Sequence, residues 1–191
     1  ANETGVAISG AEAHHNTVGA NYIGPDAAGT GDLGNALYGV MLEDGAHHNT
    51  IGGNTGSPRN VISGNDNHGV LISGEGTSYN TVAGNYIGVN SAGSAALSNG
   101  GNGVNIRFLA SDNTIGGDTA AERNVISGNT INGVQIYLDS EHNFVTGNYI
   151  GLNWDASGGL GNGANGVLIN EGSNRNTIGG DRDQGRGNVI S

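Results

Sequence analysis

Residues 113–129, with the sequence NTIGGDTAAERNVISGN, decide the fold, because residues 49–65 repeat them almost letter for letter as NTIGGNTGSPRNVISGN. Each copy holds two short apolar segments that open with Asn and close with Gly or Ser. Segments this short cannot bury an apolar face alone, so each must lie against the same segment of a neighbouring copy. The two copies therefore indicate a stack of structural repeats.

The repeat extends to both ends of the chain and includes a further segment, Gly-Val-x-(Ile or Leu). This segment begins at Gly5, Gly39, Gly69, Gly103, Gly133 and Gly166. The next segment opens with Asn16, Asn49, Asn80, Asn113, Asn143 and Asn176, and the last with Asn21, Asn60, Asn85, Asn124, Asn148 and Asn188. The pattern predicts six rungs of three short strands each.

Alternation within the segments predicts which side chains face inward, because residues i and i+2 of a strand point to the same side. Four inward columns contain only Val, Ile and Leu: Val6, Val40, Val70, Val104, Val134, Val167; Ile8, Leu42, Ile72, Ile106, Ile136, Ile169; Val18, Ile51, Val82, Ile115, Val145, Ile178; and Ile23, Ile62, Ile87, Ile126, Ile150, Ile190. The two Asn columns share this inward parity, which predicts ladders of amide hydrogen bonds with a structural role.

The rungs alternate in type. Long insertions follow the third segment of every odd rung, at residues 24–38, 88–102 and 151–165. Even rungs carry their extra residues between the two Asn instead, as at residues 54–59 and 118–123. We therefore predict one domain, 1–191, built of double-rung units at about 5–68, 69–132 and 133–191.

Composition argues against several function classes. With six Arg, no Lys and a formal charge of −11, the chain lacks the basic surface that nucleic acids need. It has no Cys for disulfides or thiolate metal sites, and no apolar run long enough to span a membrane. A start at Ala1 without Met suits a mature secreted product or an excised fragment, so we expect an extracellular or cell-surface location.

The repeats resemble those of right-handed parallel β-helix proteins of the pectate-lyase-like superfamily, particularly the Asn- and Gly-rich repeats of bacterial extracellular proteins. Besides residues 49–65 and 113–129, the resemblance rests on GNYIG at residues 84–88 and 147–151. It implies an all-β fold, a right-handed parallel β-helix or solenoid of six rungs in three double-rung units. Enzymes of that superfamily act on acidic polysaccharides, but their lyase, polygalacturonase and epimerase motifs do not occur here. We therefore expect no catalytic residues.

Two sets of residues are weak candidates for metal ligands, although we expect no cofactor. Two His pairs, His14-His15 and His47-His48, fall at the same turn of adjacent rungs, within reach of a shared metal ion. Rungs three and four carry Ser-Tyr and Ser-Asp there, so an exposed polar turn is the plainer interpretation. Asp181 and Asp183 faintly resemble a calcium loop but lack the spacing of known calcium motifs. A solvated loop explains them more simply.

The outward column of the third segment is unexpectedly apolar: Tyr22, Val61, Tyr86, Val125, Tyr149 and Val189. A surface of this kind is rarely left exposed, so either the long insertions or another molecule must cover it. Tyr22, Tyr86 and Tyr149, with Trp154 from an insertion, are candidates for contact with a glycan or a lateral partner. Packing of the insertions is the plainer alternative.

The two ends of the chain match as consecutive rungs. If Ala1 of a second copy followed Ser191, NVIS and ANETGVAIS would reproduce NVISGNDNHGVLIS with one residue fewer, and Asn2 would extend the column of Asn65 and Asn129. Such a contact is open-ended and therefore propagates. We assign it to Ala1, Asn2, Glu3, Thr4, Gly5, Asn188, Val189, Ile190 and Ser191. Excision of whole units from a longer repeat protein would give the same match.

These observations lead to a hypothesis of a non-catalytic extracellular structural protein. It is a β-helical rod that assembles head to tail with itself into a filament, or forms the shaft of a larger surface protein. The alternative is a polysaccharide-binding or polysaccharide-degrading β-helix, for which Ca²⁺ is the cofactor to consider. Nucleic acid and a membrane-spanning role are not expected.

Overall fold

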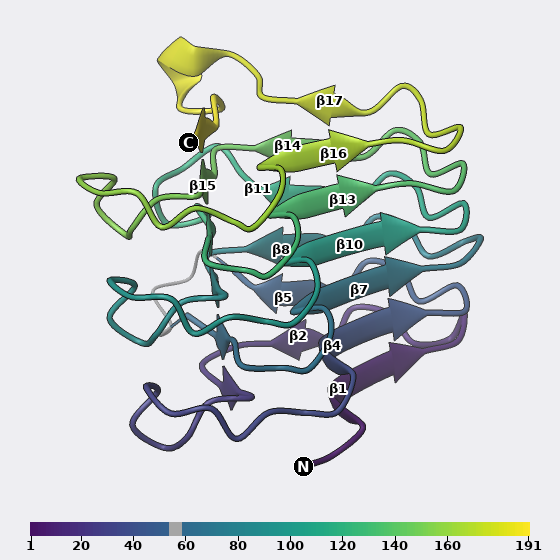
Figure 1. The fold of residues 1–191 in the computed structure, drawn as a ribbon. Coiled ribbons are helices and arrows are strands. Elements are labelled where there is room, and N and C mark those ends of the chain that lie inside the picture. The colour runs from purple at the N-terminus through teal and green to yellow at the C-terminus, as the bar shows by residue number, and fades with distance from the viewer. Residues whose placement is uncertain (54–58) are drawn as a thin grey trace.

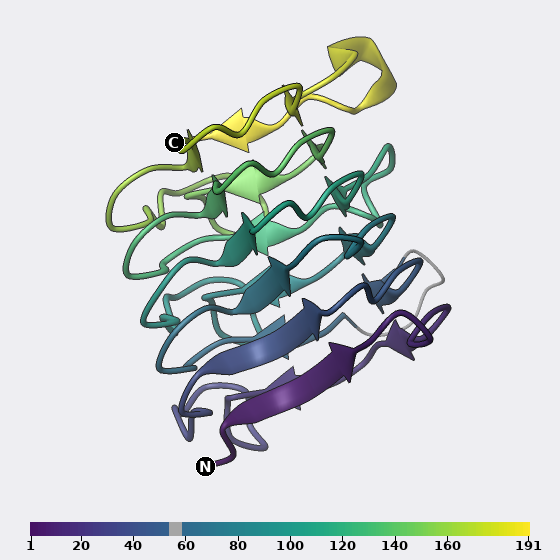
Figure 2. The same ribbon diagram turned by 90° about the vertical axis from the view of Figure 1, so that its right-hand side faces the viewer.

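The computed structural model describes residues 1–53 and 59–191 and has the architecture of a three-sheet parallel β-helix (Figure 1). The chain winds through one strand of each sheet per rung, and successive rungs stack from the N-terminal face to the C-terminal face (Figure 2). Within the described ranges each sheet has six strands, as the six-rung repeat predicted. Of the extra residues predicted at 54–59 in the second rung, 54–58 lie outside the described residues.

The strands are short in all three sheets. The first sheet consists of β1 (Thr4–Ser9), β4 (Tyr38–Glu43), β7 (Val70–Ser73), β10 (Val104–Arg107), β13 (Val134–Ile136) and β16 (Val167–Ile169). The second consists of β2 (Thr17–Val18), β5 (Thr50–Gly52), β8 (Thr81–Ala83), β11 (Thr114–Gly116), β14 (Phe144–Thr146) and β17 (Thr177–Ile178). The third consists of β3 (Tyr22–Ile23), β6 (Val61–Ile62), β9 (Tyr86–Ile87), β12 (Val125–Ile126), β15 (Tyr149–Ile150) and β18 (Val189–Ile190). A single 3-10 turn, η1 (Arg182–Gln184), is the helical element of the described chain.

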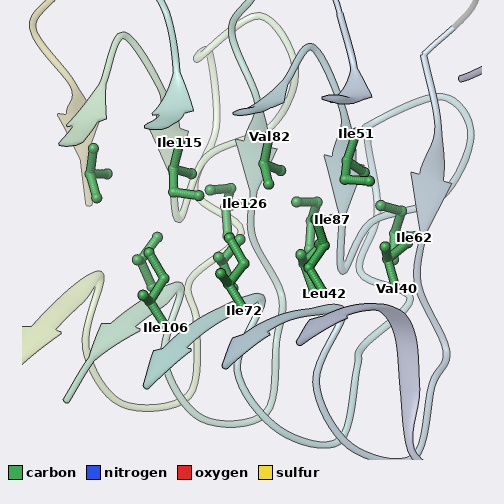
Figure 3. Close-up of a cluster of buried hydrophobic side chains, with 14 of the residues drawn as sticks. Val40, Leu42, Ile51, Ile62, Ile72, Val82, Ile87, Ile106, Ile115 and Ile126 are labelled. Atoms are coloured by element: carbon green, nitrogen blue, oxygen red, sulfur yellow. The ribbon is translucent and has the colours of Figure 1, made fainter. Parts of the chain in front are cut away.

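Strand register follows the repeat, so the predicted core columns are confirmed. Val104 pairs with Val70 on one side and with Val134 on the other, and Ile106 pairs likewise with Ile72 and Ile136. Ile106, Ile115 and Ile126 come from the three different sheets and point into a common interior, where all three are fully buried (Figure 3). Burial of one such column member stabilises the fold by about 1.5–3 kcal/mol relative to its exposure.

The predicted Asn ladders are also confirmed, at two corners of the rungs. At the first corner Asn80 Nδ2 donates to Asn113 Oδ1 over 3.0 Å, and the same step continues from Asn113 to Asn143 over 3.1 Å. At the second corner Asn85 Nδ2 donates to Asn124 Oδ1 over 3.0 Å. These amides are fully buried, so the ladder satisfies polar groups that would otherwise be costly to desolvate.

A third ladder was only partly predicted. It runs from Asn35 through Asn65, Asn99 and Asn129 to Asn162, with Nδ2 to Oδ1 distances of 2.7–3.0 Å. Sequence alignment of the rungs paired Asn65 with Asn129 alone, because the other three members lie within the long insertions. Each long insertion therefore returns to the same corner of the β-helix, where its Asn joins the third ladder, before the next rung begins.

A left-handed backbone turn precedes each first-corner Asn. The residue before it has φ between 55° and 59° in all six rungs: His15, His48, Tyr79, Asp112, His142 and Arg175. Non-glycine residues adopt this conformation at a cost of about 1–2 kcal/mol. Bonds from the following Asn offset that cost; Asn49 Nδ2, for example, donates to the carbonyl oxygens of Ala13 and His47. The side chains at this turn are consequently aligned from rung to rung along the axis of the rod.

The long insertions project on one side of the rod in every second rung (Figure 1). Each doubles back through an isolated antiparallel bridge, such as Val89 with Ala96 and Leu152 with Gly159. They also contact one another: Ser91 N–H donates to Gly29 O over 2.9 Å, and Trp154 N–H donates to Gly93 O over 3.0 Å. The insertions form an outer layer against the third sheet.

Candidate functional site

The C-terminal face of the rod exposes core residues. Ile169, Ile178 and Ile190 belong to inward columns whose inner members are fully buried, yet they are 38%, 37% and 48% exposed. Val189 is 43% exposed, and Ser191 is exposed beside it. The last described rung therefore leaves part of its apolar core uncovered.

The N-terminal face carries the other predicted assembly residues. Ala1, Asn2 and Glu3 are exposed, Thr4 is half-buried at the start of β1, and Gly5 follows it in the same strand. Asn2 O accepts a 2.8 Å hydrogen bond from Ala36 N, as Asn35 O does from Asp66 N in the next rung. The backbone of Asn2 therefore makes the same kind of bond to the next rung as the backbone of Asn35, a member of the third ladder. The sequence match between the two ends had aligned Asn2 with Asn65 and Asn129 of that ladder.

The Asn ladders give the rod a direction. In the three ladders described above, the Nδ2 group of the lower rung donates to the Oδ1 atom of the rung above, as Asn16 does to Asn49 over 2.9 Å and Asn148 to Asn188 over 3.1 Å. A shorter ladder of Asn102, Asn132 and Asn165 runs in the opposite sense, with Asn165 Nδ2 donating to Asn132 Oδ1 over 2.8 Å. Among described atoms, Asn16 Oδ1 receives no donor at the N-terminal face, and the backbone N–H of Asn188 has no acceptor at the C-terminal face. At the ends of these Asn ladders the first face thus presents side-chain acceptors and the second presents backbone donors.

The apolar outward column of the third sheet is covered mainly by the chain itself. Val61 and Val125 are 2% exposed, and Tyr86 packs with them and Val89 in a small outer cluster. Tyr149 packs against this cluster and is half-buried. The insertions thus cover most of the column. Of the aromatic candidates, the two that remain well exposed are Tyr22, at 49%, and Trp154, at 53%.

A groove beside this cluster contains two arginines that sequence reasoning missed. Arg59 lies over the Tyr86 ring at 4.5 Å, and Arg123 lies over the Tyr149 ring at 4.3 Å and donates to the Tyr149 hydroxyl over 3.1 Å. With Ala120, Val125 and Trp154 they line a space of about 200 Å³. The available signal was the Arg that precedes Asn60 and Asn124 in alternate rungs, two residues before the apolar column.

The two His pairs lie at the same turn of adjacent rungs, and their rings stack. The His14 and His47 ring centroids are 5.0 Å apart and those of His15 and His48 are 5.4 Å apart, with interplanar angles of 15°. The Tyr79 ring continues the second column 5.0 Å from that of His48. Within the described ranges, no three His, Asp or Glu residues converge so that they could hold one metal ion.

Asp181 and Asp183 lie together in an exposed turn. Asp183 N–H donates to Asp181 Oδ1 over 2.9 Å, and Gln184 N–H donates to the Asp181 carbonyl oxygen at η1. The carboxylate of Asp181 therefore caps its own turn. This arrangement agrees with the plainer interpretation of a solvated loop.

A polar cluster on the outer face of the first sheet had no sequence prediction. The Arg107 guanidinium donates to the Tyr38, Tyr137 and Ser73 hydroxyls, each over 3.4 Å. Hydrogen bonding and charge interaction with the two tyrosines raise the pKa of Arg107 against the opposing effect of its partial burial, which is the largest influence. The cluster therefore links side chains of several successive rungs on the outer face of this sheet.

His68 belongs to the same face. It is buried beside Tyr38, whose ring is stacked on it at 5.7 Å, and its Nδ1 accepts a 3.0 Å hydrogen bond from Asn102 N. Burial, with the nearby charge of Arg107, lowers the pKa of His68 to about 4. The imidazole is therefore neutral at pH 7 and has a structural partner.

Comparison with protein-family models, with curated proteins and with solved structures finds no match for this chain. In the part of the chain that the structure describes, no helix is long and apolar enough to cross a membrane. Function must therefore be argued from the surfaces described above.

Proposed function

We propose that this chain is a non-catalytic structural rod whose two end faces each receive a further β-helical rung. The added rung comes from a second copy, which gives a head-to-tail filament, or from neighbouring repeats in the shaft of a larger surface protein. Membership of the pectate-lyase-like superfamily and a location outside the cell are part of this proposal, and they rest on the resemblance of the repeats.

The observation that carries the proposal is the complementarity of the two faces. The N-terminal face presents Oδ1 acceptors at Asn16 and Asn21, and the C-terminal face presents backbone donors at Asn176 and Asn188. Stacking one face on the other extends each ladder with the bonds that already join its rungs. At these ladder positions two like faces would oppose acceptor to acceptor or donor to donor, so head-to-tail contact is the arrangement that continues these ladders.

Apolar burial adds to this contact. The side chains of Ile169, Ile178 and Ile190 become core residues once a rung covers them, and burial of such surface is worth about 25 cal/mol per Å². The faces are small, which favours a reversible assembly that depends on protein concentration.

Negative-stain microscopy and sedimentation of the purified chain over a range of concentrations test the filament version. We expect rods that lengthen with concentration at constant width. Monodisperse particles of one rod length at high concentration would contradict self-assembly and leave the shaft version, in which the same faces are covered by adjacent repeats. A longer parent protein that does not place β-helical repeats next to this segment would contradict that version too.

A second candidate function is binding of an acidic polysaccharide in the groove of Arg59, Arg123 and Trp154. An exposed indole suits the face of a sugar ring, and guanidinium groups suit carboxylates. The two arginines stand two rungs apart, about 9.5 Å by the spacing of strands, so they can contact separated acid groups of one extended polymer. The overall charge of −11 opposes such binding except at this groove.

Calorimetric titration with an acidic and a neutral polysaccharide tests this second function. We expect the acidic polymer alone to bind, and the Arg123→Gln variant to bind at least tenfold more weakly. Equal binding of both polymers, or none, would remove this candidate. Release of unsaturated sugars, assayed with and without Ca²⁺, would instead show a catalytic activity and overturn the structural proposal.

A further inference from the structure

The two His pairs have a geometry that their sequence positions do not reveal. His14 Nδ1 lies 2.8 Å from His15 Nδ1, and His47 Nδ1 lies 2.9 Å from His48 Nδ1. Within each pair the rings are nearly perpendicular, at 86° and 85°. We propose that each pair is a two-nitrogen site for a transition-metal ion of the Cu²⁺ class. The two pairs lie at the turn between the first and second sheets, so this inference is independent of the end faces of the rod and of the groove that contains Arg59 and Arg123.

The nitrogen separation points to a particular coordination geometry. Two nitrogens 2.8 Å apart, each about 2.0 Å from one ion, subtend roughly 90° at that ion. This is the angle between neighbouring ligands in a square-planar or tetragonal site, which Cu²⁺ prefers. A tetrahedral Zn²⁺ site with the same bond lengths would need nitrogens about 3.3 Å apart. The pairs therefore favour Cu²⁺ over Zn²⁺.

Each short contact between nitrogens also holds one proton that a metal can replace. Two Nδ1 atoms at 2.8 Å form a hydrogen bond only when one is protonated and the other offers its lone pair. When an ion binds, that proton moves through solvent to Nε2 of the same ring, so both rings stay neutral and each gives an Nδ1 lone pair to the ion. The other coordination positions then belong to solvent, because both pairs lie in exposed turns.

The fold holds the pairs in place before any ion binds. His15 and His48 occupy the left-handed turn at φ of 59° and 55°. The buried Asn49 amide stabilises the turn of the second pair by donating to His47 O, and it also donates to Ala13 O beside the first pair. The backbones of His14 and His47 are joined by a parallel bridge, and their rings stack at 5.0 Å. Since little conformational freedom remains to be lost, binding should cost less than at a flexible His pair.

The four imidazoles make two sites and not one. No described group of three or more ligands converges on a single ion, so each pair supplies two nitrogens separately. Ions in the two pairs would lie about as far apart as the stacked rings, 5.0–5.4 Å. Two divalent charges at that separation repel each other, so we expect the second Cu²⁺ to bind at least tenfold more weakly than the first.

Titration of the intact chain with CuCl₂, followed by calorimetry and by electron paramagnetic resonance, tests the proposal. The matched variants replace each pair by the residues that rung three carries at this turn, Ser78 and Tyr79. They are H14S/H15Y, H47S/H48Y and the quadruple variant that combines them, and the repeat itself shows that these residues fit the turn. His142→Asp, which copies Asp112 of rung four, is a control at a turn with a single His.

We expect wild type to bind two Cu²⁺ ions with a tetragonal spectrum that shows two nitrogen ligands per ion. Each double variant should lose one site and the negative cooperativity, the quadruple variant should lose both, and His142→Asp should behave as wild type. Zn²⁺ should bind at least tenfold more weakly than Cu²⁺. Wild-type copper binding by the folded quadruple variant, or no copper-dependent nitrogen signal in wild type, would overturn the proposal.

Discussion

His68 Nδ1 accepts the backbone N–H of Asn102 at 3.0 Å, in the column where Asn102 Oδ1 accepts the N–H of Asn132 one rung further on. Histidine thus replaces the first amide of a fourth Asn ladder, which continues to Asn165. The imidazole must stay neutral to accept this bond. A histidine at this ladder position therefore makes the stability of the fold sensitive to acid.

We predict a loss of stability between pH 7.5 and pH 5 that depends on His68. Its pKa is about 4 in the folded chain and about 6.5 in the unfolded chain. The unfolded state therefore takes up the proton first as the pH falls, and stability declines below pH 6.5 until the pH reaches about 4. This site should account for about 2 kcal/mol at pH 5.

Urea denaturation at the two pH values measures this effect. The matched variant is His68→Asn, which continues the ladder with an amide that does not titrate. It should remove about 2 kcal/mol of the acid-dependent loss while leaving the response of all other groups in place. Identical pH dependence in wild type and His68→Asn would show that His68 does not carry the effect.

We predict that an inner ladder amide contributes far more to stability than an outer one. Asn85 Nδ2 donates to Ile51 O and to Asn124 Oδ1, and its Oδ1 accepts from Asn60. Asn85→Ala leaves these buried partners unsatisfied and should cost about 3 kcal/mol or more. Asn21→Ala, at the exposed end of the same ladder, should cost about 1 kcal/mol. Similar losses in thermal or urea unfolding would contradict a cooperative buried ladder.

We predict that the glycine just before a strand of the first sheet, such as Gly103 before β10, is required for close approach between rungs. A Cβ atom at Gly103 would lie 2.7 Å from Gly133 O and 2.5 Å from Ile126 Cγ2. Because backbone cannot move away cheaply there, Gly103→Ala should lower the unfolding free energy by about 2 kcal/mol or more. Gly159→Ala, where a Cβ meets no atom within 4 Å, is the control and should unfold like wild type. Equal stability of the two variants would refute the packing argument.

We predict that a charge on the C-terminal face blocks assembly. Ile190 is 48% exposed there, and Ile190→Arg would require burial of an unpaired guanidinium when a rung is added. Filaments formed by wild type should therefore be absent by sedimentation and microscopy. Ile131→Arg is the control, because Ile131 is similarly exposed, at 44%, on a turn between the third and first sheets. Assembly of Ile190→Arg at the wild-type concentration would exclude this face as the contact.

The sequence by itself determined the columns that build the rod. Val104, Ile106, Ile115 and Ile126 occupy the same repeat positions as their neighbours above and below, so aligning the repeats already identified the pairs that pack and hydrogen bond. The reason is that a solenoid brings together residues separated by one repeat, and this separation is written in the spacing of the motifs. The two main Asn ladders followed from the same register.

Only the tertiary structure decided what lies outside those columns. The contact of Arg123 with the Tyr149 ring depends on how a loop and a strand meet on the outer surface. The return of Asn99 to the third ladder depends on the path of an insertion whose length differs from that of the even rungs. The nitrogen separation in the His14-His15 pair depends on side-chain torsions set by a left-handed turn. Repeat spacing fixes which rung a residue belongs to, whereas these contacts depend on side-chain direction and loop path, which the spacing leaves free.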